Sequence, residues 1–331
     1  MQVLVGDIGG TKTGLALAAP AGEGIELSAQ TRYPSGQFGC LGDIIARYLE
    51  ATGAHVETAA LAVAGPVRDG RSRTTNLPWE IDAGELEGRF GLQRVALLND
   101  LEAVAWGIPA LAESDLAVLQ PGAADARGNA CVVAAGTGLG QAGLFWDGRR
   151  HRPFATEGGH CSFAPTTDSR EIGLLVHLTK RYGHVSWERV VSGMGIGNIY
   201  GFLAEQAKTA HADAVAQALA DGGDLAAAVA MTAAAGACPV CADAMDLFAC
   251  LYGREAGNVA LKHMALGGVY LGGGIAPKNL DMLQRSGFLA GFRDKGRMRA
   301  LMEQIPVRVI LDPHTPLRGA ARYLDAARAL W

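Results

Sequence analysis

The same layout of strand, glycine-rich turn and strand occurs twice in this chain of 331 residues, and no other feature constrains its fold as much. Residues 3–19 read as an apolar strand, a Gly-Gly-Thr turn and a second alternating strand, which is the pattern of a β-hairpin. Residues 131–146 repeat this pattern with a Gly-Thr-Gly turn. The repeat predicts an internal duplication, with two α/β halves facing each other across a cleft.

Apolar periodicity extends this organisation along the rest of the chain. The runs at 59–64 and 95–98 are dense enough in apolar residues for strands that are buried on both faces. The other predicted elements are strands at 25–33, 268–271 and 307–311, helices at 41–52, 101–107, 243–264 (amphipathic) and 316–330, and an alanine-rich helical region at 204–237. We expect a smaller α/β domain over 1–110, joined by a C-terminal helix at 315–331, and a larger α/β domain over 111–314.

Composition limits the classes of partner. Hydrophobic residues make up 49% and charged residues 19% of the chain, so a globular protein is expected rather than a disordered one. A net charge of -4 without a basic cluster argues against nucleic acid and anionic membranes as partners. The N-terminus enters a strand directly, without the regions of a signal peptide, and no apolar run reaches the length of a membrane span.

The six cysteines indicate a reducing compartment. Three of them lie in apolar or glycine-rich surroundings, which suits buried, reduced thiols, and a cytoplasmic location is therefore expected. Cys238 and Cys241 form a single C-x-x-C pair, with no second pair downstream. Because a zinc site takes four ligands, zinc binding by this pair is disfavoured.

The first glycine turn is suited to binding phosphate. Glycines let the backbone approach a large anion, and the amides of Gly9, Gly10, Thr11 and Lys12 could point at a phosphate, while the carboxylate of Asp7 could hold a metal ion or its water. An ordinary tight hairpin explains the same residues equally well. The turn is not a P-loop, because that motif must open a helix and a strand follows here.

The second turn contains a G-x-G-x-x-G match that begins at Gly138. Glu157 even lies about 20 residues further on, where a ribose-binding acid is expected in a dinucleotide-binding unit. However, the residues after the match alternate like a strand, whereas that fingerprint opens a helix. Dinucleotide binding is therefore disfavoured.

Two polar residues, Asn99 and Asp100, end the strand at 95–98. The carboxyl edge of an α/β sheet is where ligands bind, and a carboxylate there could accept a proton from a substrate hydroxyl, as phosphotransferases require. The alternative is that one of the two caps the helix that follows. Such a cap could account for one of these two residues, but less easily for both.

Further polar side chains lie on glycine corners and in loops. They are Glu157 and His160 around two glycines, the run Thr74-Thr75-Asn76, and the pair Trp187-Glu188. Each of them alone could be an ordinary polar residue on the protein surface. Together they are a plausible set for binding the hydroxyl groups of a sugar, because carboxylates accept hydrogen bonds and amides both donate and accept.

With these motifs in this order along the sequence, the whole chain resembles the bacterial glucokinases of the hexokinase and actin-like ATPase superfamily. The motifs that carry the resemblance are Asp7-Ile8-Gly9-Gly10-Thr11, Ala64-Gly65-Pro66, Thr75-Asn76, Asn99-Asp100, Gly136 to Gly140, Glu157 to His160, Phe163-Ala164-Pro165, His184 to Val190, Ser192-Gly193 and Gly272 to Ile275. The resemblance implies the two-domain actin-like ATPase (ribonuclease H-like) α/β fold, with duplicated cores and a cleft between the domains. It also implies a homodimer that phosphorylates glucose with ATP and Mg2+.

The resemblance assigns a role to each candidate residue. Asp100 would be the general base on the 6-hydroxyl of glucose, and the other hydroxyls would be bound by Asn76, Asn99, Glu157, His160 and Glu188. The phosphates of ATP would lie on Gly9, Gly10, Thr11, Lys12, Thr137 and Gly138, and the adenosine against Gly273 and Gly274. Asp7 would help to place Mg2+, which neutralises the developing charge.

The sequence departs from the family pattern at two points. Lys12 stands where close relatives often have asparagine, and the cysteine-rich zinc motif of the repressor and sugar-kinase branch is missing after His160. The chain therefore resembles the zinc-free type. A kinase for fructose, mannose or an N-acetylhexosamine stays open as an alternative. A non-catalytic sugar sensor is less favoured, because Asp100 is present and no helix-turn-helix precedes the first strand.

Overall fold

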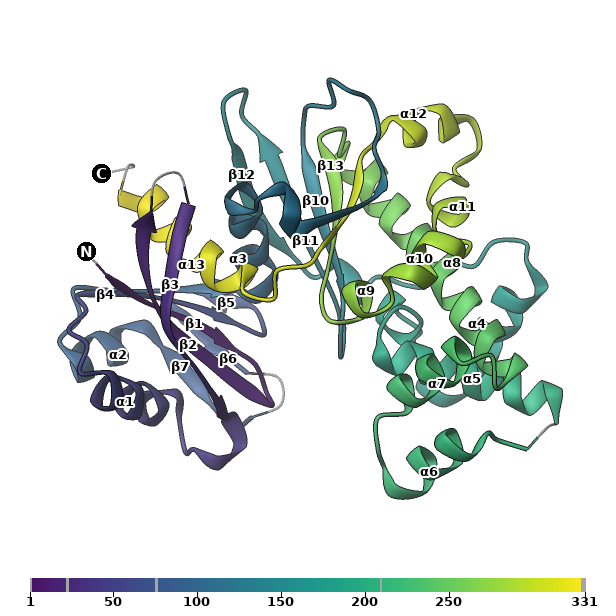
Figure 1. Ribbon diagram of the computed structural model, residues 1–331, viewed down its shortest axis with the longest axis horizontal. Coiled ribbons are helices and arrows are strands. Elements are labelled where there is room, and N and C mark those ends of the chain that lie inside the picture. The colour runs from purple at the N-terminus through teal and green to yellow at the C-terminus, as the bar shows by residue number, and fades with distance from the viewer. Residues whose placement is uncertain (1, 22–23, 75–76, 209, 329–331) are drawn as a thin grey trace. The chain divides into compact units, whose positions relative to one another are not determined.

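Two sheets with corresponding strand orders organise the chain (Figure 1). The first has the order β3-β2-β1-β4-β8 and the second the order β12-β11-β10-β13-β14-β9. In the first sheet β1 pairs antiparallel with β2 and parallel with β4, and in the second β10 pairs antiparallel with β11 and parallel with β13. The computed structural model describes residues 2–21, 24–74, 77–208 and 210–328. The predicted duplication is thus present in the strand order.

The first unit contains the residues up to Leu116, the short segment Arg152–Ala155 and the segment from Asp312 onward. Its main sheet consists of β1 (Val3–Ile8), β2 (Lys12–Ala21), β3 (Gly24–Pro34), β4 (Thr58–Val63) and β8 (Arg94–Asn99). A small second sheet consists of β5 (Val67–Arg68), β6 (Arg71–Arg73) and β7 (Glu80–Asp82), and the helices are α1 (Leu41–Thr52), α2 (Ala83–Phe90), α3 (Asp100–Gly107) and α13 (Thr315–Arg328).

Helices lie on both faces of the main sheet in this unit (Figure 1). They bury β1 and β4, whereas β3 at the sheet edge is largely exposed. Alternate side chains of β1 point to opposite faces, so Leu4 and Ile8 pack with α1 and α2, whereas Val3 and Val5 pack with α3 and α13. The face toward α13 carries mainly alanines of β2, β4 and β8, which let the helices approach the sheet closely. The carboxyl ends of β1, β4 and β8 are thereby held rigidly at one edge.

The second unit covers Ala117–His151 and Thr156–Leu311. The strands of the second sheet are β9 (Leu116–Gln120), β10 (Ala130–Ala135), β11 (Leu139–Trp146), β12 (His151–Thr156), β13 (Gly268–Gly272) and β14 (Val307–Ile310). The helices of this unit are α4 (Ser169–Tyr182), α5 (Gly193–Ala207), α6 (Asp213–Asp221), α7 (Leu225–Ala234), α8 (Pro239–His263), α9 (Ile275–Lys278), α10 (Leu280–Arg285), α11 (Phe288–Arg293) and α12 (Arg299–Gln304).

Helix α8 is the centre of the second core. The prediction of an amphipathic helix at 243–264 is wrong in two respects. The helix begins earlier, at Pro239, because Cys238 caps it: its sulfur accepts the N–H of Cys241 at 3.3 Å. It is also buried around much of its circumference, since α5, α7 and α11 and the sheet all pack on it. The C-x-x-C pair therefore has a structural role at the helix start, and all six cysteines are free thiols.

The alanine-rich helical region at 204–237 consists of several helices, because Lys208 and Gly222 adopt left-handed conformations that end α5 and α6. One further expectation needs correction. Leu139 and Gly140, expected in a turn, already belong to β11. Among the described residues no single helix is long and apolar enough to cross a membrane; α7 and α8 pass that test only as a pair bent by 107°.

Candidate active site

In the first unit, parallel strands bring three of the predicted motifs to one edge of the sheet. Ile8 on β1 is level with Val63 on β4, and Val63 is level with Asn99 on β8. The residues that follow these strands are therefore neighbours at the carboxyl edge, where ligands of α/β proteins bind. The sequence argument that placed Asn99 at this edge is confirmed by the strand register.

The first glycine turn is fixed by hydrogen bonds within its unit. The Gly9 N–H donates to the Lys12 carbonyl at 3.0 Å, so this amide is engaged in the hairpin itself. Ser35, the first residue of the 3₁₀ turn that follows β3, supports the glycine turn: its hydroxyl donates to the Gly9 carbonyl at 2.8 Å, and its N–H donates to the Thr11 carbonyl at 3.0 Å. Sequence reasoning missed Ser35, because nothing in the local pattern links it to a turn more than twenty residues away. Gly10, Thr11 and Lys12 form the rest of the turn, and Lys12 opens β2 rather than a helix, which confirms that this is not a P-loop.

Asp7 lies half-buried on β1, one residue before the strand ends. Burial raises the pKa of Asp7 above its ordinary value, and the positive charge of Arg32 opposes this shift. The register explains the pairing, because Asp7 lies opposite Gly14 and Gly14 opposite Arg32, so no side chain separates the two charged groups. A pocket of about 240 Å³ is lined by Asp7, Arg32 and His314, among others.

Asp7 and its surroundings fit Mg2+ only if other groups complete the coordination shell of the ion. No cluster of three or more His, Cys, Asp or Glu side chains that could hold a metal occurs among the described residues. Mg2+ usually takes one or two carboxylates and completes its shell with water and substrate phosphates. Asp7 therefore suits a magnesium ion that arrives with a nucleotide, and not a cage built by protein alone.

Asn99 and Asp100 form the junction of β8 and α3. Asn99 caps the helix, as its Oδ1 accepts the N–H groups of Leu101 at 2.9 Å and Glu102 at 3.2 Å. Its Nδ2 donates to the Gly65 carbonyl at 3.2 Å, which joins the Ala64-Gly65-Pro66 motif to this edge. The cap explanation therefore holds for Asn99. Asp100 is the first residue of α3, half-buried, and its Oδ1 accepts the N–H of Leu101 at 2.9 Å.

Asn76, the remaining sugar-binding candidate of the first unit, lies outside the described residues. Its neighbour in the polar run, Thr74, is buried, and its hydroxyl donates to the carbonyls of Leu77 at 3.1 Å and Trp79 at 3.4 Å. Thr74 thus holds the local chain rather than facing a ligand.

The second unit repeats the arrangement of glycine turns at a sheet edge. β10 and β13 are parallel, with Ala134 level with Gly272, so the turn at Gly136 and the turn at Gly273 are neighbours. Gly273 has φ of 77°, and a Cβ there would overlap the Ala135 carbonyl oxygen. Only glycine fits at this position.

A large pocket lies beside these two turns. Its volume is about 1140 Å³, and its lining includes Thr137, Gly193, Gly274, Lys278 and Asn279. Thr137 and Gly274 were predicted to contact ATP, and both line this pocket. Lys278 and Asn279 carried no motif in the sequence, so they could not have been identified without the fold.

The sugar-binding candidates of the second unit lie on two short 3₁₀ turns, Gly158–His160 and Trp187–Arg189. Glu157 and His160 are both exposed, and His160 Nε2 lies 3.8 Å from Glu157 Oε2. Glu188 is half-buried, and its Oε2 accepts the N–H of Leu139 at 3.0 Å. Trp187, grouped with these polar residues in the sequence, is a core residue that stacks edge-on against Phe163.

The G-x-G-x-x-G match runs along a strand, as expected. Its residues after Gly138 belong to β11, which is paired with β10 over its length. No helix opens at these glycines, so the geometry of dinucleotide binding is missing at this point of the described chain.

Comparisons with known proteins extend these observations to the full length. A family model described as Glucokinase matches residues 4–327. The glucokinase of Nostoc punctiforme is 40% identical over 98% of this chain and 99% of its own length, and that of Synechocystis sp. is 41% identical over 97% of each. A solved glucokinase structure from an Antarctic psychrotroph is 34% identical, with a TM-score of 0.84 over 98% of this chain and 99% of that one.

The duplicated units, each with a glycine turn at the edge of a mixed sheet, and these likenesses define a two-domain sugar kinase with the actin-like ATPase fold. More specifically, the chain belongs to the glucokinase family. The resemblance inferred from the motifs is confirmed over nearly the whole sequence.

Proposed function

We propose that the chain transfers the γ-phosphoryl group of MgATP to the 6-hydroxyl of glucose, with Asp100 as the general base. The observation that carries this proposal is the position of Asp100 at the carboxyl edge of the first sheet, in a chain about 40% identical to glucokinases over almost its full length. Asp100 takes the proton of the 6-hydroxyl while the oxygen of that hydroxyl attacks the γ-phosphorus. The bond between the γ-phosphorus and the oxygen that bridges it to the β-phosphate breaks, and ADP is released.

The two glycine turns would hold the nucleotide. Gly10, Thr11 and Lys12 in the first unit and Thr137 and Gly138 in the second would bind the phosphates, while Gly9 supports its turn through the hairpin bond. The adenosine would occupy the 1140 Å³ pocket against Gly273 and Gly274, of which Gly274 is among the lining residues. Mg2+, held by Asp7 and the phosphates, would supply charge neutralisation in the transition state.

The sugar would be held by side chains with complementary donors and acceptors. Glu157, His160 and Glu188 from the second unit and Asn76 and Asn99 from the first would bind the hydroxyls that do not react. The Oδ1 of Asn99 caps the helix, and one Nδ2 hydrogen is donated to the Gly65 carbonyl. The second Nδ2 hydrogen would therefore be the one donated to a sugar.

A coupled assay for ADP with purified protein, MgATP and glucose tests this function directly. Glucose-dependent ADP release that requires Mg2+ supports it, and no release contradicts it. Competition by fructose, mannose and N-acetylglucosamine in the same assay distinguishes a glucokinase from a kinase for another hexose. Mobility shifts of promoter DNA would instead favour a sugar sensor.

We further propose that the enzyme works as a cytoplasmic homodimer. Six free thiols and the use of ATP support the compartment, and the family resemblance supports the dimer. Light scattering after size-exclusion chromatography checks the dimer, since a chain of 34.4 kDa should then elute at about twice this mass.

A further inference from the structure

We propose that the turn assigned to phosphate binding in the second unit also builds the sugar site, because its Gly138–Leu139 peptide positions the carboxylate of Glu188. The inference rests on the proposed function and makes Gly138 and Leu139 positioning residues for the sugar. Its consequence is that the phosphate turn sets the affinity for glucose even when no nucleotide is bound.

The backbone at Glu188 is held on both sides. Trp187, immediately before it, is buried, and its N–H donates to the Cys161 carbonyl at 2.9 Å. The hydroxyl of Ser192 donates to the Glu188 carbonyl at 2.6 Å. With the main chain fixed, the orientation of the carboxylate depends on the bond that its Oε2 accepts from the N–H of Leu139 at 3.0 Å.

Gly138 packs directly against the same carboxylate oxygen. A Cβ at residue 138 would overlap Glu188 Oε2, whereas a Cβ at Gly136, in the same turn, would meet no atom within 4 Å. Neither glycine has a left-handed φ, so alanine fits the backbone at both positions. Gly138 is therefore required for the position of Glu188 and not for the shape of the turn.

The carbonyl side of Leu139 contacts the other sugar-binding turn. A Cβ at Gly159, which lies between Glu157 and His160, would overlap the Leu139 carbonyl oxygen. One residue of β11 thus contacts Glu188 with its N–H and the Glu157–His160 turn with its carbonyl group. Both sugar-binding elements of this unit are docked on the residue that follows the phosphate turn.

Gly138→Ala tests the inference, with Gly136→Ala as the matched control. Glucose dissociation constants are measured by calorimetry without nucleotide. We expect Gly138→Ala to weaken glucose binding roughly 10- to 100-fold, the value of a lost hydrogen bond to a charged group, and to raise KM for glucose more than it lowers kcat. Gly136→Ala should keep the glucose dissociation constant, measured without nucleotide, within about twofold of wild type. An unchanged glucose affinity in Gly138→Ala overturns the inference.

A double-mutant cycle identifies the route of the effect. In a Glu188→Ala background, Gly138→Ala should cause no further loss of glucose affinity, because it acts through the missing carboxylate. A full additive loss means that Gly138 acts otherwise, and the inference fails. If Gly138→Ala does not fold, amide exchange at Leu139 replaces it: Glu188→Ala should speed this exchange, and an unchanged rate counts against the bond.

These outcomes separate the inference from the function on which it rests. A wild-type enzyme that phosphorylates no hexose contradicts the proposed function. A wild-type enzyme that phosphorylates glucose, together with a Gly138→Ala variant that binds glucose normally, contradicts only the positioning role.

Discussion

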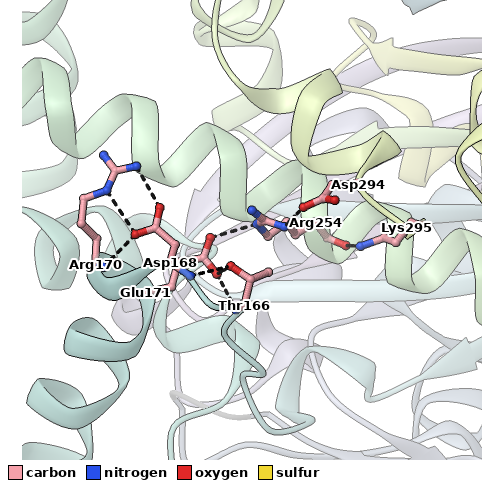
Figure 2. A network of polar contacts seen from close by, with 7 residues as sticks. All are labelled: Thr166, Asp168, Arg170, Glu171, Arg254, Asp294 and Lys295. Carbon is pink, nitrogen blue, oxygen red and sulfur yellow. Dashed lines mark hydrogen bonds and ion pairs between the residues drawn. The ribbon is translucent and has the colours of Figure 1, made fainter. Parts of the chain in front are cut away.

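Arg254 Nε lies 2.9 Å from Oε1 of Glu171, a carboxylate with only 1% of its side-chain surface exposed (Figure 2). The other oxygen of Glu171 accepts the N–H and the hydroxyl of Thr166, at 2.7 and 2.8 Å. This charge pair joins α4 to α8, and Asp294 extends it beyond α11. It lies in the second unit and links helices of this unit to one another.

Removing the Arg254 side chain from this pair should destabilise the folded protein. We expect Arg254→Met to lower the free energy of unfolding by about 3–5 kcal/mol, because it leaves the Glu171 carboxylate buried without a counter-charge. Arg170→Met, which breaks the exposed pair with Asp168 nearby, should cost less than about 1 kcal/mol. Urea denaturation of the two variants measures both values, and equal small losses would contradict the assignment.

Lys295 should make stability depend on alkaline pH. Burial and the neighbouring Arg254 lower its pKa to about 8, against the attraction of Asp294 and Glu255. Between pH 8 and the ordinary lysine value of 10.5 the unfolded chain binds more protons than the folded one, so the free energy of unfolding rises with pH. In Lys295→Met this contribution disappears. Denaturation series at pH 7 to 10 should therefore show a steeper rise for wild type than for the variant, and parallel curves would refute this.

Cys238 caps α8 with a sulfur atom, which is a weak acceptor. Serine at this position offers an oxygen to the same N–H, so Cys238→Ser should keep or raise the thermal midpoint. Cys238→Ala removes the cap and should cost about 0.5–2 kcal/mol. Calorimetric unfolding of both variants checks the difference, and identical midpoints would show that the sulfur contributes nothing to the helix.

Asp100→Asn should lower kcat by about 10²–10⁴-fold, the usual contribution of a general base, with a much smaller change in KM for glucose. Asparagine keeps the size of the side chain and its acceptor for the Leu101 N–H, so the start of α3 should be preserved. Glu113→Gln, an exposed change in the same unit, serves as the control. Near-normal turnover in Asp100→Asn would mean that another group takes the proton.

The sequence was most informative where a residue type and its local pattern decide the structure together. The helix at Leu41–Thr52 has the predicted bounds, and the strand that ends at Asn99 places its polar residues at the predicted edge. These elements have strong apolar periodicity and clear polar ends, so their neighbours in space add little to what the pattern already indicates.

Other features depend on contacts between distant residues and could not be predicted. The bond from Leu139 to Glu188 joins positions 49 residues apart, and no local signal indicates it. The sequence predicted an amphipathic helix at 243–264, and its charged residues were therefore expected on a polar face. In the fold, one of these, Glu255, is fully buried and accepts hydrogen bonds from Gln141 and Asn258. The capping role of Asn99 also needed the structure, which shows that its Oδ1 accepts two N–H groups at the start of α3.

The packing of α13 on the first sheet has a consequence for how the protein is made. The faces of β1, β2 and β4 that pack with Leu317, Ala320 and Leu324 are synthesised early, yet this helix leaves the ribosome only after the entire second unit. The second unit can therefore fold during translation, while the first waits with part of its apolar face uncovered. The first unit, which carries Asp100, can therefore complete its core only after the whole second unit has been synthesised.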